Sequence, residues 1–196
     1  LFIHKVKLSE PELAMAAMEK ETTGFIYIVT QFSLQVFNLE NGFMAKEYTH
    51  ISFLKMNTAE KYEYIKHVHG EILAFYVHLQ TADWQEADIK HLNRLVSAVR
   101  NGMYAAKNMK DAMHDVELLR NSSNDIKFSV FRETSEKTKL FYKELLALLL
   151  QKDGMPLFNK LAAMYKEVIQ RYTEELNQLY KKHVLQNLSE TEISTI

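Results

Sequence analysis

The fold is decided by residues 9–42, SEPELAMAAMEKETTGFIYIVTQFSLQVFNLENG. Ser9 and Glu12 form a capping-box pattern, in which each side chain satisfies a free backbone N–H at a helix start, and Pro11 fits the first turn. We expect this helix to end at the Asn-Gly pair that closes the stretch and to be about 48 Å long, as in an elongated bundle. Its mainly apolar stripe, spaced by three and four residues, is Met15, Met18, Thr22, Phe25, Val29, Phe32, Val36 and Leu39.

The same periodicity predicts four further helices after a connector at residues 49–56. Polar caps, turns, glycine and proline mark their boundaries, at Asn57 or Thr58, residues 81–83, residues 121–125, Ile126, Lys152, Asp153-Gly154 and Pro156. The second helix carries Ile65, Val68, Ile72, Phe75 and Leu79; the third Ile89, Leu92, Val96, Val99, Met103, Ala106, Met109, Met113 and Val116; the fourth Val130, Phe141, Leu145 and Leu148; and the fifth Leu157, Leu161, Met164, Val168, Tyr172, Leu176 and Leu179. The sequence therefore predicts an all-α, antiparallel helical bundle.

Composition excludes several classes of protein. The chain has 196 residues with only five Gly and two Pro, too few for the many tight turns of a sandwich or barrel. With a net charge of −1 there is no excess of cations to bind a row of phosphates, so we expect no nucleic-acid partner. The absence of Cys excludes a disulfide, a thiolate nucleophile and a zinc finger.

The helices group into a weak internal repeat. We expect a lead-in segment at residues 1–8, continuing from an upstream region, a first three-helix repeat at residues 9–121 and an incomplete second repeat at residues 122–196. A second capping box near Ser189 predicts a sixth helix that is cut off at Ile196. No run of 18 or more apolar residues occurs, so we expect the fragment itself to be soluble.

A candidate metal site lies on the third helix. Asp111, His114 and Asp115 are three and four residues apart and share one helix face, where they could offer two carboxylates and an imidazole to a divalent or ferric metal ion. The alternative is a solvated face on which Lys107 pairs with Asp111, and this is the favoured interpretation because one helix alone rarely completes a metal site.

Two other polar groups were weighed against plainer explanations. In His67-Val68-His69 the two imidazoles diverge on a helix, which leaves His67 with Glu71 as the only sensible pair for a metal ion. Ordinary surface histidines are the favoured explanation. The turn that follows Arg120 could bind an anion, but helix capping by its serines is the favoured explanation. The sequence has no Gly-rich phosphate loop and no nucleophile elbow.

Two segments carry a family resemblance. MYAAKNMKD (103–111), followed by Asp115 and the turn NSSND (121–125), resembles the PhoU-like helical domain. More closely, it is similar to the cytoplasmic domain that follows the membrane part of bacterial sodium-dependent phosphate transporters. The opening PELAMAAMEKE (11–21) resembles the first helix of that domain. The resemblance implies two repeats of three antiparallel helices.

The sequence departs from this family at the metal motif. The family's motif is an acidic residue followed four residues later by Asp, on the third helix of each repeat. Aligned on AKN (106–108), these positions fall on Lys110 and His114. Asp111 and Asp115 are also four residues apart, but each lies one residue after the position of the family's motif. This shift rotates the pair by about 100° around the helix.

The leading hypothesis is a non-enzymatic regulatory domain of a sodium/phosphate cotransporter, on the cytoplasmic side of the plasma membrane. Its partner would be the membrane-transport domain of the same chain or a phosphate transporter, and a homodimer is left open. One alternative is a free-standing PhoU-type regulator of phosphate uptake. The alternative from another class is a metal-dependent helical-bundle enzyme that uses Asp111, His114 and Asp115.

Overall fold

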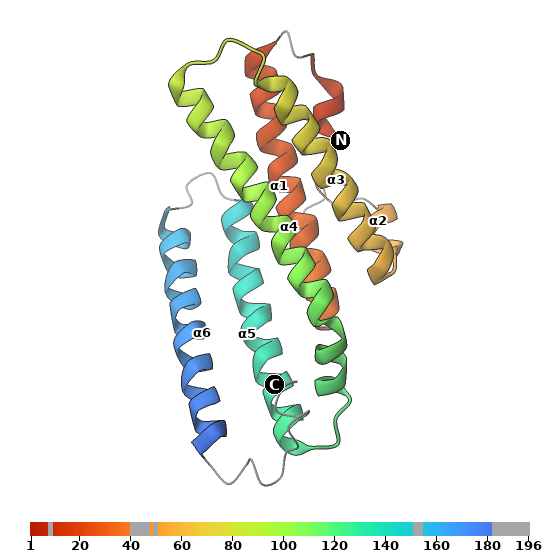
Figure 1. Ribbon diagram of the computed structural model, residues 1–196, viewed down its shortest axis with the longest axis vertical. Coiled ribbons are helices and arrows are strands. Elements are labelled where there is room, and N and C mark those ends of the chain that lie inside the picture. Colours follow the sequence, from red (N-terminus) through yellow and green to blue (C-terminus); the bar gives the residue numbers. More distant parts are fainter. Residues whose placement is uncertain (8–9, 40–47, 49–50, 151–154, 182–196) are drawn as a thin grey trace. The chain divides into compact units, whose positions relative to one another are not determined.

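The computed structural model of the chain describes residues 1–7, 10–39, 48, 51–150 and 155–181. All regular elements in these ranges are helices, and none of the described residues forms a strand. This confirms the predicted all-α fold. The elements are the 3-10 helix η1 (Phe2–Lys5) and the α-helices α1 (Pro11–Val36), α2 (Ile51–Lys55), α3 (Thr58–Leu79), α4 (Glu86–Arg120), α5 (Asp125–Leu150) and α6 (Met155–Lys181) (Figure 1).

The chain forms two compact units. The first consists of Leu1–Val36 and Glu40–Asp111, and the second of Phe37–Leu39 and Ala112–Ile196. The boundary falls inside α4, which contributes its longer N-terminal part to the first unit. The predicted repeats, with their boundary at residues 121–122, stay a prediction.

In the first unit, α1 packs antiparallel to α3 and supplies the centre of the core (Figure 1). Its predicted stripe is buried from Met18 to Val36, and Phe25 and Phe32 are fully enclosed. Burial of such large side chains is the main stabilising term in folding. The fully buried apolar residues of α3 and α4 that complete this core include Ile65, Ile72, Val68, Val99 and Ala106.

Two boundaries near the end of α1 differ from the prediction. The helix ends at Val36 rather than at residue 42, because Asn38 adopts a left-handed backbone (φ 55°), a conformation that terminates helices. The Asn-Gly pair at 41–42 lies outside the described residues. The predicted connector at residues 49–56 contains the short helix α2, whose single turn gives too weak a periodicity to detect in the sequence.

Two helix starts are set by local polar side chains, as the caps predicted. The Asn57 carboxamide oxygen accepts the backbone N–H of Glu60 at 2.9 Å, and the Glu60 carboxylate accepts the N–H of Asn57 at 2.8 Å. This reciprocal box confirms Asn57 as the cap of α3. At α5, Asn124 accepts the N–H of Ile126 at 2.9 Å, so the helix starts one residue earlier than predicted.

In the second unit, α5 packs side by side with α6 (Figure 1). Tyr142 and Leu146 of α5 are buried, and Lys160 donates to the Glu144 carboxylate at 2.8 Å across the pair. The predicted end of the fourth helix at Lys152 and the predicted sixth helix near residue 189 lie outside the described residues.

Candidate functional site

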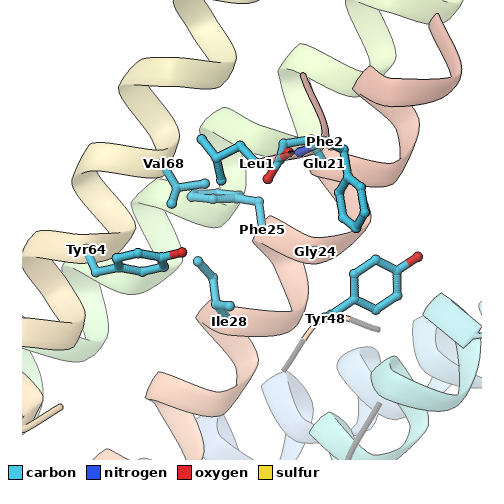
Figure 2. A pocket seen from close by; sticks show the side chains of 9 residues that line it. All are labelled: Leu1, Phe2, Glu21, Gly24, Phe25, Ile28, Tyr48, Tyr64 and Val68. Atoms are coloured by element: carbon cyan, nitrogen blue, oxygen red, sulfur yellow. Dashed lines mark hydrogen bonds between the residues drawn. The ribbon is translucent and has the colours of Figure 1, made fainter. Parts of the chain in front are cut away.

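A small cavity in the first unit is a candidate site among the described residues. It lies where η1 and Tyr48 meet α1 and α3, and its volume is only about 20 Å³, which is room for about one water molecule. Figure 2 shows its lining, which is Leu1, Phe2, Glu21, Gly24, Phe25, Ile28, Tyr48, Tyr64 and Val68. The wall is therefore mostly apolar and aromatic, with one carboxylate.

Glu21 supplies the only charged side chain in this lining. It lies on the inward face of α1 and is only 5% exposed. One carboxylate oxygen accepts the backbone N–H of Phe2 at 2.5 Å and that of Ile3 at 3.4 Å. No lysine, arginine or histidine among the described residues pairs with it, so two amide dipoles are its local compensation.

Tyr64 of α3 forms the opposite polar part of the wall, and its hydroxyl points toward Phe25 and Ile28 in Figure 2. Burial raises the pKa of this phenol, and the nearby Glu21 carboxylate raises it further. Both effects disfavour the phenolate, so the group remains a neutral hydroxyl that can donate or accept a hydrogen bond.

Gly24 keeps the cavity open on the α1 side. A Cβ atom built there would lie 3.2 Å from Cδ1 of Tyr48, closer than ordinary van der Waals contact. Any larger residue at this position would push into the space between the ring and the helix. An alanine at this position would therefore require the Tyr48 ring to shift by a few tenths of an ångström.

The N-terminal residues form one wall of the cavity through specific contacts. Ile3 is buried, and the imidazole of His4 lies 2.9 Å from the Glu71 carboxylate of α3. The Nζ atom of Lys20 lies 4.3 Å from the centre of the Phe2 ring, within cation-π distance. The segment is thus attached to both α1 and α3.

The predicted metal ligands lie on the exposed surface of α4. Lys107 donates to the Asp111 carboxylate at 2.8 Å, which is the pairing predicted as the alternative to metal binding. This contact raises the pKa of Lys107. Among the described residues, no three His, Cys, Asp or Glu side chains gather in a way that could hold a metal ion. Metal binding by Asp111, His114 and Asp115 therefore stays a prediction.

Two histidines lie close to carboxylates of other elements in the first unit. Glu71, the only sensible metal-binding partner of His67 in the sequence, contacts His4, because the N-terminal segment reaches α3. His91 of α4 lies 2.6 Å from Glu19 of α1 and ties these helices together. Both partners are distant in sequence, so no local spacing could indicate them.

The polar turn between α4 and α5 is held by its own side chains. Asn124 caps α5, and its backbone N–H donates to the Ser122 hydroxyl at 3.1 Å. Arg120 lies 3.7 Å from the Glu117 carboxylate. These contacts agree with the capping explanation of the turn, in which Asn124 acts as the cap rather than a serine.

Sequence reasoning missed Glu21 and Tyr64. One local signal was available, since Glu21 lies between Met18 and Phe25 on a helix face that is otherwise apolar. A carboxylate in that position is rare unless it is paired. Tyr64 carries no such signal, because its importance depends on the α1–α3 contact.

Within the described ranges, no helix is both long enough and apolar enough to span a membrane. Comparisons of the chain with protein-family models, with curated proteins and with solved structures find no match.

Proposed function

We propose that this chain is a non-enzymatic, PhoU-like regulatory domain that acts on phosphate transport, as part of a sodium-dependent phosphate cotransporter. The proposal rests on the resemblance of residues 11–21 and 103–111 to that domain. In the structure these segments belong to α1 and α4, which precede and follow α3 along the chain in the first unit. The order of three long helices in this unit carries the proposal.

The contacts of the first unit favour a regulatory rather than a catalytic role. Glu19 and His91 join α1 to α4, and Glu71 and His4 join α3 to the N-terminal segment. We propose that such links pass a displacement of one helix to the others, because they join elements that are packed together. A domain of this kind regulates a partner through its position, without chemistry of its own.

The first test is to read the encoding frame upstream of Leu1 and to measure sodium-dependent phosphate uptake by the full encoded protein. We expect several apolar spans of about 20 residues upstream. Replacing residues 58–120, which contain α3 and α4, with a flexible linker should change the uptake rate at an equal amount of protein in the membrane.

The control for this test is the full protein with Glu136→Gln, which alters an exposed carboxylate of α5. It should transport phosphate at the original rate. Uptake that is unaffected by loss of α3 and α4 would contradict the proposal. An initiator Met directly before Leu1 would favour the free-standing regulator instead, which would then be tested against a phosphate transporter and its sensor kinase.

A further inference from the structure

We propose that residues 1–5, the N-terminal strap, form a detachable element that opens and closes on α1 and α3 while the rest of the first unit stays folded. The strap contains η1 and supplies one wall of the small cavity. Three observations carry the inference: the strap buries little apolar surface, it is anchored on Glu21, and the core is built from other side chains. The inference goes beyond the proposed function and does not depend on it.

The apolar contacts of the strap are few. Ile3 is its one buried side chain, at 3% exposed, whereas Leu1 and Phe2 are half-buried and His4 and Lys5 are exposed. The helix η1 has four residues and no side-chain cap. A helix this short has almost no stability of its own, so the strap stays in place only through its contacts with α1 and α3.

Glu21 of α1 is the polar anchor of the strap. Its carboxylate is 5% exposed and accepts the backbone N–H groups of Phe2 and Ile3, at 2.5 and 3.4 Å (Figure 2). Burial of a carboxyl group is costly unless hydrogen bonds replace its hydration. These two bonds exist only while the strap is docked, and water replaces them when it opens. The dehydration of Glu21 therefore opposes the burial of Ile3 and narrows the free-energy gap between the closed and the open strap.

The other contacts of the strap lie at the surface. The His4 imidazole is 2.9 Å from the Glu71 carboxylate, and both side chains are more than a third exposed. The Nζ atom of Lys20 lies 4.3 Å from the centre of the Phe2 ring. Exposed pairs contribute little to stability, because water competes for both partners. These contacts orient the strap but hold it weakly.

The core of the first unit is built mainly from other side chains. Phe32 of α1, Ile72 of α3 and Val99 of α4 are fully buried, and none of them lines the cavity beside the strap. Opening of the strap uncovers the cavity wall, which includes Ile28 and Val68. A segment with few buried contacts beside a well-packed core is the kind that opens locally, without global unfolding.

The test is alkylation of single-cysteine variants by iodoacetamide, since the natural chain contains no Cys. Ile3→Cys places a thiol in the strap, Ile72→Cys places one at a buried core position, and Val77→Cys supplies an exposed thiol. We expect the thiol at position 3 to react more slowly than the one at position 77 and faster than the one at position 72. Low urea should barely change its rate, because a local opening exposes little surface.

Glu21→Ala tests the anchor. In the Ile3→Cys chain this change removes both acceptor oxygens and should speed alkylation at least about tenfold. In the Ile72→Cys chain it should change the rate much less. Glu21→Gln keeps one oxygen acceptor and should have a smaller effect than Glu21→Ala. The control Glu136→Ala, at an exposed carboxylate of α5, should alter neither rate.

The amino group of Leu1 needs its own control, because Leu1 also lines the cavity. Acetylation of this group removes its positive charge but leaves the N–H groups of Phe2 and Ile3 in place. If Glu21 holds the strap through these two amides, the thiol at position 3 should remain slow to react after acetylation.

Several results would overturn the inference. Equal rates at positions 3 and 72 would mean that the strap opens only on global unfolding, and equal rates at positions 3 and 77 would mean that it is not docked. An unchanged rate in Glu21→Ala, or a fast rate after acetylation, would refute the anchor. If circular dichroism shows that Glu21→Ala does not fold, Phe2→Pro removes one donated N–H without altering α1 and should also speed alkylation at position 3.

Discussion

At the scale of single residues, the first unit combines apolar burial with polar groups whose ionisation depends on the fold. Tyr64 and His69 both lie beside Phe25 or the cavity that it lines. Burial lowers the pKa of the half-buried His69 imidazole, and the nearby Arg100 lowers it further. The folded state therefore prefers neutral His69, while the unfolded chain titrates near the ordinary value of about 6.5.

This difference predicts a pH dependence of stability. Below about pH 6.5 the unfolded chain binds a proton at residue 69 that the folded chain resists, so the contribution of His69 to stability is lost as the pH falls. We expect the urea midpoint to decrease between pH 7.5 and 5.5, and to decrease less in His69→Gln. Parallel pH profiles of the two proteins would contradict this assignment.

Lys61 is another side chain whose pKa is lowered by burial in the folded state. The side chain is largely buried, and its Nζ atom donates to the Gln35 carboxamide at 2.5 Å and lies 5.3 Å from the Phe53 ring centre. Burial lowers its pKa. Its position against α2 explains how a charged residue is tolerated next to the core, since an amide and an aromatic face replace part of its hydration.

At the scale of helices, the approach of α4 to α1 depends on Gly102. A Cβ atom there would lie 2.8 Å from Cδ1 of Ile26 and 2.9 Å from Cε1 of Phe25. These distances are too short for carbon atoms, so a larger residue must displace the core side chains. The glycine thus serves helix packing, although it lowers intrinsic helix propensity.

A matched pair of substitutions tests this. Gly102→Ala should destabilise the chain by about 1–3 kcal/mol, because overpacking outweighs the gain in helix propensity. Gly70→Ala on α3, where the new Cβ meets nothing, should instead stabilise it by about 0.5–1 kcal/mol. Urea unfolding measures both, and equal stabilisation by the two alanines would refute the close packing.

At the scale of the whole molecule, α6 carries a row of exposed apolar side chains. Phe158, Tyr165, Ile169 and Tyr172 are each about half exposed, and their spacing of seven, four and three residues places them on one face of the helix. An apolar face of this kind usually marks a contact surface, for a further segment of the chain or for a second molecule.

We therefore expect the chain to associate with itself as its concentration rises. Sedimentation velocity over a range of concentrations measures this, and Ile169→Lys with Tyr172→Ser should reduce it. Val77→Ser changes an exposed apolar residue of α3, outside the α6 row, and should not reduce the association. A chain that remains monomeric at every concentration would contradict the expectation.

Much of the fold follows from local patterns in the sequence. The apolar stripes place α1, α3, α4, α5 and α6, since a helix repeats its faces every 3.6 residues whatever its surroundings. The Asn57 box was also predictable, because its hydrogen bonds connect residues three positions apart. The end of α1 and the single turn of α2 were not, since short elements carry little periodicity.

The sequence by itself determined the class of fold and the approximate helices, because both depend on interactions between neighbours along the chain. Only the tertiary structure decided the candidate site. It brings Glu21 of α1, Tyr64 of α3 and the amides of Phe2 and Ile3 around one cavity, and it pairs Glu71 with His4. The physical reason is that these contacts join residues 18 to 67 positions apart, whose meeting depends on how the helices pack.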